Sequence, residues 1–487
     1  MKDGKDVGVF LLSDTYLEGD IDDGQSIDSD NDSSEAAVPT RVLSLGKLVF
    51  ISFFLTCGGP FGLETAVKAG GVGLCLAGLV VLPFIWAIPQ CLMTAELSTM
   101  INVNGGALVW VWRGLGELPG VINAANGLAT SILDLSIYPN LIVSYLPFTL
   151  GALPSYLCKV LIVALVTSVN VLGLEAVSTV SVCLLVISMG VFFVEIPYAI
   201  FHFQSASWTK TPANIDWALL SSVLLWANTG YDSLGTFAGE VHTPSKTYPR
   251  GIALTLIANS SAYIGPVVLS YILLPSCNLW ENDGFLQAAE KTSYAVAVWM
   301  TVAASLSNVG KLNAGVATTS RLMWAMGAKI QEDGVSMRTL PSMFGKLSPR
   351  FGTPTTALFV QFIVASIFCQ FDFSTIVQVE MLLNCLCLGF EFAAFMRLRY
   401  TEPDTPRPFL VSGGMAGAWF ITIIKSIVVV FTVVSIVWRR PMAFLGMIVF
   451  NCFVITTYTI RRFYRKKYRG ELTRSSSSLR HAILGAA

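Results

Sequence analysis

The chain has 487 residues, of which 54% are hydrophobic and only 13% are charged, with 31 basic and 31 acidic side chains. Soluble proteins carry about a quarter charged residues on average, so roughly half of the usual complement is present. A soluble fold of this length cannot bury so much apolar surface, whereas a lipid bilayer can cover it. The balanced charge gives a nucleic-acid partner no electrostatic support. The composition therefore predicts an all-α integral membrane protein with the lipid bilayer as its surroundings.

Cysteine and histidine usage argues against an enzyme. The ten cysteines lie mostly inside apolar stretches, without CxxC pairs or histidines at zinc spacing. They read as small hydrophobic residues, so we expect neither a disulfide framework nor a metal site. Three histidines offer little material for acid–base catalysis, and GxSxG and nucleotide-binding glycine motifs are absent from the sequence. A membrane receptor or a lipid enzyme is a disfavoured alternative, and we expect no cofactor.

Three parts are predicted along the chain. Residues 1–38 are rich in Asp and Ser and lack an apolar period, which is typical of a disordered acidic cytosolic tail. This stretch also lacks the charged and apolar regions of a signal peptide. Residues 42–465 contain the apolar segments and form the predicted transmembrane domain. Residues 466–487 are expected to form a basic, Ser-rich cytosolic tail.

Apolar segments of spanning length follow one another through the transmembrane part. One helical crossing needs about 20 residues. Twelve segments are predicted, near residues 43–67, 73–99, 119–146, 156–171, 175–201, 216–240, 251–274, 294–326, 355–370, 375–398, 417–438 and 441–460. Lys and Arg gather in the connections that lie on the same side as both termini. By the positive-inside rule both termini face the cytosol, and the plasma membrane is the expected location.

Two of these segments are interrupted near their middle. The first contains CGGPFG at residues 57–62, where Gly and Pro break the ladder of backbone hydrogen bonds. The sixth contains the polar run WANTGYD at residues 226–232. Because the two interruptions lie five segments apart, they favour a five-plus-five inverted-repeat transporter. Two unrelated kinks in a helical bundle are the alternative.

The motifs around these interruptions resemble those of the amino acid–polyamine–organocation superfamily, in its plant and trypanosomatid polyamine-uptake branch. They are GGPFGLE at 58–64, PFIWAIPQCLMTAEL at 83–97, WANTGYDSLGTFAGEVHTPSKTYPR at 226–250, and the stretch from Glu380 to Pro408. The resemblance implies a five-plus-five fold with two added helices, and proton-coupled import of polyamines such as putrescine or spermidine. A cationic or neutral amino-acid permease or exchanger is the alternative. Such a permease needs a surface for the substrate carboxylate, which the amides around Gly58 and Gly59 would supply.

Acidic residues outnumber basic ones inside the predicted segments. The acids are Glu96, Asp134, Glu195, Asp232, Glu240, Glu380 and Glu391, and the bases are Lys311, Arg321 and Lys425. A charge at the bilayer centre costs about 2.5–3.5 kcal/mol even on lenient insertion scales. We therefore expect some of these carboxylates to face a cavity and to bind a cationic substrate or a proton.

Asp232 is the leading substrate-binding candidate, together with Trp226 and Asn228 in the same interruption. The resemblance implies an acid at the position of Asp232 in relatives with cationic substrates, and Trp226 beside the substrate. A buried carboxylate near an aromatic face suits an ammonium group. Capping of the second half-helix is the alternative role for Asp232.

Two further pairs share a helix face. Asp134 and Tyr138 are four residues apart, and either face a cavity or form an internal hydrogen bond. Glu380 and Glu391 are separated by three helical turns. Glu380 is assigned to the distal amine of a polyamine, whereas Glu391 is expected to form an ion pair with Arg397 or Arg399.

The remaining acids are assigned to coupling, gating or structure. Glu64 and Glu240 are coupling or gating candidates, with local ion pairs to Lys68 and to Lys246 or Arg250 as alternatives. Glu96 is expected to be structural. The resemblance places Gly315 where plant relatives carry an acid, and Ser188 where some bacterial relatives carry a lysine. A carboxylate is then expected to carry any proton coupling.

Overall fold

The computed structural model describes residues 44–484, apart from residues 102–104, 147, 149, 173, 202–207, 242, 282, 329–330, 333–334 and 337–338. The predicted acidic tail at residues 1–38 lies outside the described residues. Within the predicted basic tail at 466–487, the backbone continues as a helix to Leu484. The two predicted tails are therefore not tested.

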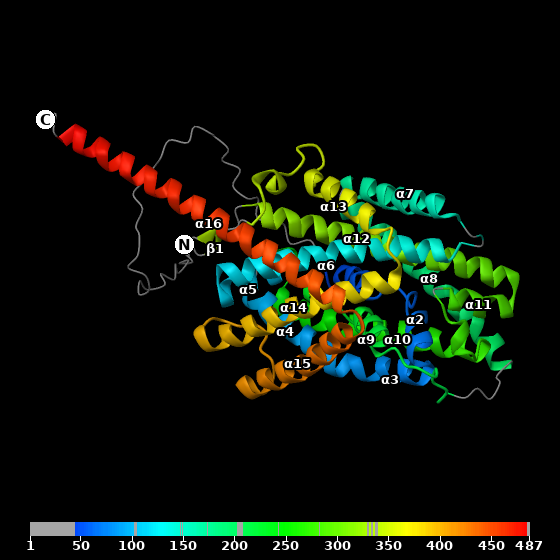
Figure 1. Ribbon diagram of the computed structural model, residues 1–487. Helices are drawn as coiled ribbons and strands as arrows, with labels where there is room; N and C mark the ends of the chain where they lie inside the picture. The colour runs from blue at the N-terminus through cyan, green and yellow to red at the C-terminus, as the bar shows by residue number, and fades with distance from the viewer. Residues whose placement is uncertain are drawn as a thin grey trace, which may run out of the picture. The chain divides into compact units, whose positions relative to one another are not determined.

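Helices make up most of the described chain (Figure 1). The α-helices are α1 (Leu45–Thr56), α2 (Glu64–Gly70), α3 (Val72–Leu82), α4 (Ile88–Met100), α5 (Ala107–Leu115), α6 (Glu117–Ser144), α7 (Ala152–Val171), α8 (Leu174–Phe201), α9 (Trp217–Ala227), α10 (Pro244–Leu273), α11 (Gly284–Thr292), α12 (Tyr294–Gly327), α13 (Thr355–Phe368), α14 (Phe373–Thr401), α15 (Gly414–Arg439) and α16 (Pro441–Leu484). A π-helical turn, η1 (Pro83–Ala87), joins α3 to α4, and the 3-10 helices are η2 (Asp232–Glu240), η3 (Cys277–Leu279) and η4 (Ser342–Gly345). The strands β1 (Gln331–Glu332) and β2 (Val335–Ser336) pair antiparallel.

Each predicted apolar segment overlaps one or more of these helices. By length and composition, seven stretches of the described residues are helical and apolar enough to cross a membrane. They are Val72–Met100, Ala152–Val171, Pro244–Leu273, Tyr294–Gly327, Phe373–Thr401, Gly414–Arg439 and Pro441–Tyr464. The all-α class and the membrane location are confirmed, while the number of crossings stays a prediction. Sequence analysis missed α5 and α11, because both are shorter than a crossing and lie in connections.

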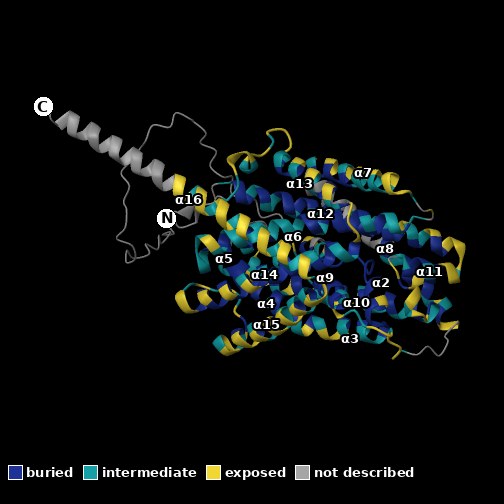
Figure 2. Cartoon of the chain, in the orientation of Figure 1, coloured by how far each residue is buried: buried dark blue, intermediate teal, exposed yellow. Residues whose placement is uncertain are grey.

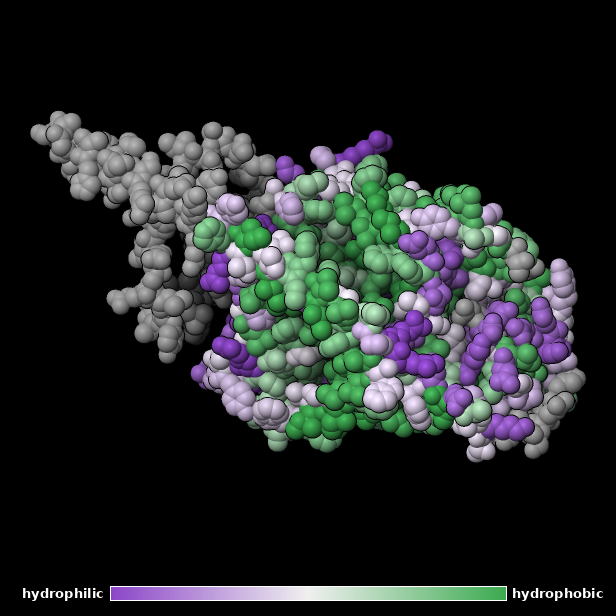
Figure 3. Space-filling model, viewed as in Figure 1, coloured by the Kyte–Doolittle hydropathy of each residue, from purple (hydrophilic) through white to green (hydrophobic). Residues whose placement is uncertain are grey.

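Apolar side chains cover much of the outer surface. Leu161 of α7, Ile427 of α15 and Phe453 of α16 are more than half exposed, and Trp438 is 90% exposed. Figure 2 shows exposed residues along α7 and α16, and Figure 3 shows a broad hydrophobic area with hydrophilic side chains in smaller groups. Exposed apolar surface of this extent is stable only against lipid or another apolar partner.

The interior is built around three long helices, α6, α12 and α14. The helix α12 packs against α6 and α8, and α14 packs against α6, α5 and α9. In Figure 2 the helices α12 and α14 are mostly dark blue, because few of their side chains reach the surface. Polar residues on these helices therefore face protein or an internal cavity.

Candidate functional site

The first interruption separates α1 from α2. Gly58 and Gly59 have φ angles of +64° and +140°, which residues with a side chain rarely adopt. A Cβ atom at Gly58 would lie 2.4 Å from Lys311 Cγ, and one at Gly59 would lie 2.7 Å from Ser307 Oγ. The Ser307 hydroxyl also donates a hydrogen bond to the Gly58 carbonyl. The predicted interruption is confirmed, and α12 packs directly onto it.

The second interruption lies between α9 and η2 and touches the first. A Cβ atom at Gly230 would lie 3.1 Å from the Leu55 carbonyl oxygen at the end of α1. The Tyr263 hydroxyl of α10 lies within donating distance of two carbonyl oxygens, those of Ala227 at 2.7 Å and Thr56 at 3.0 Å. One tyrosine hydroxyl thereby lies between backbone carbonyls of the two interruptions and donates its single proton to either. Sequence analysis missed Tyr263, which a search for polar residues inside apolar segments would have found.

A cavity of about 150 Å³ lies between the interruptions and the helices α6, α12 and α14. Among the described residues, the acidic, basic and aromatic side chains of its lining are Asp134, Tyr138, Trp226, Asp232, Lys311, Glu380 and Glu391. Five of these were predicted for the site: Asp134, Tyr138, Trp226, Asp232 and Glu380. Gly58, Gly59 and Asn228 are not part of the lining, and the Asn228 amide donates to the Leu224 carbonyl of its own helix. The structure thus brings most of the predicted residues together around one space.

Asp134 holds two aromatic side chains in place. The Trp226 indole Nε1 donates to Asp134 Oδ1 over 2.9 Å, and the Tyr138 hydroxyl donates to Asp134 Oδ2. The two rings lie with their centroids 6.4 Å apart and their planes inclined by 36°. The two roles weighed for Asp134 and Tyr138 therefore occur together, because the hydrogen-bonded pair also faces the cavity.

Lys311 of α12 places its ammonium against these two rings. The Nζ atom lies 4.4 Å from the centroid of the Trp226 ring and 5.7 Å from that of Tyr138, within the range of a cation–π contact. The residue is only 6% exposed. No residue that the structure describes forms a hydrogen bond or an ion pair with this ammonium. Sequence analysis noted Lys311 as one of few intramembrane bases but did not assign it to the site.

Asp232 is linked to a second buried lysine through a glutamine. Gln90 Nε2 donates to Asp232 Oδ1 over 2.5 Å, and the Lys425 ammonium donates to Gln90 Oε1 over 3.0 Å. Lys425 also donates to the carbonyl of Trp86, which lies in the π-helical turn η1. Because Lys425 belongs to α15, a helix beyond the first ten predicted segments supplies this cation. Sequence analysis placed Asp232 at the site and noted Lys425 as an intramembrane base, but it assigned Lys425 no partner and missed Gln90.

Glu380 and Glu391 of α14 complete the acidic lining. Both side chains are buried, and the Oε2 atom of each has no hydrogen-bond partner among the described residues. The expected ion pair of Glu391 with Arg397 or Arg399 is wrong, since Arg399 pairs with Glu96 and no ion pair joins Glu391 to Arg397 among the described residues. The error arose because sequence distance along α14 placed Arg399 near Glu391, whereas the guanidinium bends toward α4. Glu391 is therefore a lining residue that sequence analysis assigned to structure.

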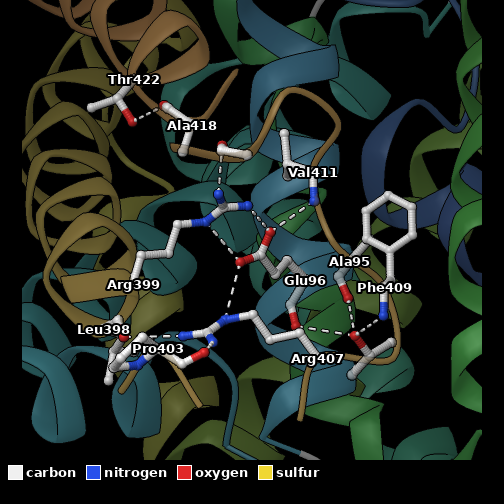
Figure 4. A network of polar contacts seen from close by, with 12 residues as sticks. Ala95, Glu96, Leu398, Arg399, Pro403, Arg407, Phe409, Val411, Ala418 and Thr422 are labelled. Carbon is white, nitrogen blue, oxygen red and sulfur yellow. Dashed lines mark hydrogen bonds and ion pairs between the residues drawn. The ribbon is translucent and has the colours of Figure 1, made fainter. Parts of the chain in front are cut away.

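Glu96 of α4 lies in a polar cluster outside the cavity lining (Figure 4). The cluster joins α4 to α14 and to the connection between α14 and α15. Arg399 donates to both carboxylate oxygens of Glu96, with Nε 2.9 Å from Oε1. Arg407 Nε lies 3.4 Å from the same Oε1, and the Val411 amide donates to Oε2 over 2.9 Å. Glu96 is thus fully paired, and its predicted structural role is confirmed.

Glu64 does not form the local ion pair weighed for it. Lys68 pairs with Glu281 in the loop before α11. The Glu64 carboxylate instead accepts hydrogen bonds from the Gly62 amide, over 2.6 Å, and from the Tyr145 hydroxyl. Glu64 is completely buried beside the first interruption and outside the cavity lining. Its role in coupling or gating stays a prediction.

The structure does not place two other predicted intramembrane acids, Glu195 and Glu240, at the cavity. Glu195 of α8 is buried, and neither of its carboxylate oxygens has a hydrogen-bond partner among the described residues. It is not part of the cavity lining. The side chain of Glu240 lies outside the described residues, so the predicted gate at this position is not tested. Within the described chain, His, Cys, Asp and Glu form no group of three or more that would hold a metal ion.

Known proteins resemble this chain over most of its length. A family described as "Amino acid permease" matches residues 49–460. Polyamine transporter PUT1 from Oryza sativa subsp. japonica is 34% identical over 77% of this chain and 71% of the relative. Polyamine transporter RMV1 from Arabidopsis thaliana is 32% identical over 80% and 81%, and the low-affinity putrescine importer PlaP from Escherichia coli K12 is 24% identical over 69% and 74%. Permeases move solutes across membranes, so the chain is a membrane transporter rather than an enzyme. It belongs to the amino acid permease family, which confirms the resemblance seen in the motifs.

Proposed function

We propose that this permease imports polyamines of the putrescine and spermidine class, driven by a proton gradient and without a cofactor. The observation that carries the proposal is the cavity between the two helix interruptions, where acidic side chains and aromatic rings face one space. Carboxylates pair with ammonium groups, and ring faces add cation–π attraction. The names of the rice, Arabidopsis and Escherichia coli relatives support the same substrate class.

The charge of the lining favours a substrate with more than one positive charge. The described lining holds four acids, namely Asp134, Asp232, Glu380 and Glu391, and one base, Lys311. Lys425 compensates Asp232 through Gln90, and Lys311 lies in the field of Asp134. Two carboxylates, those of Glu380 and Glu391, then remain without a cation. A buried uncompensated carboxylate is costly, so a substrate with two or more ammonium groups is favoured over one with a single positive charge.

The amino-acid alternative finds little support at the first interruption. An α-carboxylate would need free amide groups there, but the Gly58 amide donates to the Phe53 carbonyl over 2.8 Å. The Gly62 amide already donates to Glu64, and the Lys311 stem covers Gly58. The Lys311 ammonium is the group that would favour this alternative, because it could receive a carboxylate. Competition by a carboxylate-bearing substrate therefore separates the two functions.

The dimensions of the site accommodate a linear amine. A 150 Å³ cavity in another protein holds benzene, which has as many non-hydrogen atoms as putrescine. Glu380 and Glu391 are three turns apart, or about 16 Å along α14. An extended chain of single bonds spans about 3.8 Å for every three bonds, so the terminal nitrogens lie about 6 Å apart in putrescine and about 11 Å apart in spermidine. The longer amine therefore comes closer to bridging both carboxylates, whereas the shorter amine reaches one.

The same proposal extends to architecture and coupling. We assign the helices from α1 to α14 to a five-plus-five inverted repeat, with α15 and α16 added, twelve crossings in all, and both termini in the cytosol of a plasma-membrane protein. Interrupted segments at corresponding positions of two halves support this arrangement. Glu64 is the proposed carrier of the coupling proton, because it is a buried carboxylate beside the first interruption.

The direct test is uptake into proteoliposomes that contain the purified full-length chain. Labelled putrescine, spermidine and arginine are supplied outside, with and without an imposed inward proton gradient and a protonophore. We expect polyamine uptake that depends on the gradient and that excess unlabelled arginine does not suppress. Glu281→Gln serves as the matched control, because it removes a surface acid whose exposed ion pair contributes little.

Two results would contradict the proposal. Uptake of arginine or a neutral amino acid in preference to polyamines would move the function to the amino-acid alternative. Polyamine uptake that ignores the proton gradient but requires internal polyamine would identify an exchanger.

A further inference from the structure

The cavity already contains an alkylammonium group, and it belongs to the chain itself. Beyond its Cβ atom, the Lys311 side chain is three methylene groups ending in an ammonium, which is the chemistry of a polyamine arm. Its Nζ atom lies over the Trp226 ring, whose indole is held by Asp134. A ring face next to a carboxylate is the kind of surface that binds an ammonium group, whether it comes from the chain or from a substrate.

The ammonium is weakly held for a buried cation. Its contacts are the two ring faces, and no described residue donates or accepts a hydrogen bond with it. The stem of Lys311 rests on Gly58 at the first interruption, where any Cβ atom would overlap it. A long side chain that is anchored by its stem and not by its charged end can change position.

We propose that Lys311 is a tethered occupant of the substrate's ammonium position, which a substrate amine must displace. The inference rests on the proposed function only in taking the cavity as the place where a cation binds. Two ammonium groups repel each other and cannot share one ring face and one carboxylate. Substrate binding and the inward position of Lys311 therefore exclude each other.

The position of Lys311 also explains how the Asp134 carboxylate is compensated when no substrate is bound. Without a substrate, Lys311 compensates Asp134, and a buried uncompensated carboxylate would oppose movement of the helices. The ionisable groups that act on Lys311 electrostatically are Asp134 of α6, Glu64 of α2 and Cys57 after α1. Lys311 is thus a specificity-determining residue that competes with the substrate.

The first test needs binding alone. Lys311→Ala removes a fragment equivalent to n-propylamine, which should refill the space and raise the thermal unfolding temperature of the purified full-length variant. We expect no such rise with n-propanol, in the wild type, or in the matched control Lys159→Ala, whose lysine lies outside the cavity lining. Equal stabilisation of wild type and Lys311→Ala by n-propylamine, or none in either, would overturn the inference.

The second test uses Lys311→Met, which keeps an unbranched side chain one atom shorter and without the charge, in case the alanine variant does not fold. Because self-occupancy reduces apparent affinity in proportion to the occupied fraction, putrescine should bind about tenfold more tightly to this variant. Net uptake should fall, because it requires the empty transporter, in which this variant leaves Asp134 without a cation. Exchange of internal for external putrescine should continue, because the transporter is then occupied by substrate. Lys311→Arg should resemble the wild type.

These measurements separate the inference from the proposed function. A wild type that does not transport polyamines, with n-propylamine binding only to Lys311→Ala, would remove the substrate assignment and leave the tethered occupant in place. The opposite outcome is polyamine uptake by the wild type, together with equal losses of putrescine binding, net uptake and exchange in Lys311→Met. It would overturn the tethered-occupant inference and leave the proposed function standing.

Discussion

Two groups of buried carboxylates in this permease differ in how completely they are paired. Around Glu96, two guanidinium groups and one backbone amide satisfy both carboxylate oxygens. Around the cavity, Glu380 and Glu391 each keep an oxygen atom without a hydrogen-bond partner among the described residues. Both groups lie in an apolar interior where charge is costly. Complete pairing indicates a structural role, whereas incomplete pairing beside a cavity indicates a group that binds a ligand.

Asp232 stands between these two cases. Its carboxylate faces the cavity, but Gln90 connects it to the Lys425 ammonium outside the lining. The acids therefore form a graded series from fully paired, through indirectly compensated, to free. The series predicts which substitutions reduce the amount of folded protein and which reduce transport alone.

The largest effect is expected for Glu96→Gln. The substitution leaves Arg399 and Arg407 without a buried counter-charge, and breaking such a pair costs about 3–5 kcal/mol of unfolding free energy. Thermal unfolding of the purified variant and its abundance in the membrane should both fall. Glu391→Gln, made in parallel, should leave both quantities unchanged and reduce uptake. Equal loss of stability in the two variants would break the distinction between the two groups.

Asp232→Asn should have the next largest effect, on transport rather than on abundance. An amide supplies no negative charge, and losing one partner of a buried charge pair costs at least about 2 kcal/mol, or roughly thirtyfold. Uptake of labelled putrescine, corrected for surface abundance, is the measurement. Glu281→Gln is the control at the surface. Wild-type uptake by Asp232→Asn would remove this carboxylate from the site.

Lys425→Met should have an intermediate effect. The substitution removes the cation behind Gln90 but leaves Asp232 and the cavity lining in place, so uptake should fall less than in Asp232→Asn, by about tenfold. Because the two residues act through one network, the double variant should be no worse than Asp232→Asn alone. Losses that simply multiply in the double variant would show that Lys425 acts independently of Asp232.

The smallest and most selective effect is expected for Glu380→Gln. An amine held at one end needs a second carboxylate, so diamine and triamine uptake should weaken severalfold while uptake of any amino acid is unaffected. The transport efficiencies of spermidine and putrescine, each divided by that of arginine, are the quantities to measure in this variant and in Glu391→Gln. Unchanged ratios in both variants would show that the carboxylates of α14 do not discriminate substrates by length.

Sequence patterns predicted the elements of this fold well because their causes are local. The apolar segments follow from composition, and the first interruption follows from Gly58, Gly59 and Pro60, whose backbone preferences hold in any surroundings. Asp134 and Tyr138 were paired correctly for the same reason, since residues four apart on one helix must be neighbours. Sequence reasoning failed where the partner comes from a distant helix, as when Arg399 was assigned to Glu391.

The sequence by itself thus determined that the chain is an all-α membrane protein, interrupted within two of its apolar segments and rich in buried acids. Only the tertiary structure decided which acids are paired, because Arg399, Lys425 and Lys311 each reach their partners across helices far apart in the chain. Helix packing, and not spacing along the chain, sets where a long side chain places its charge. For that reason the cavity, its free carboxylates and the lysine inside it became visible only in three dimensions.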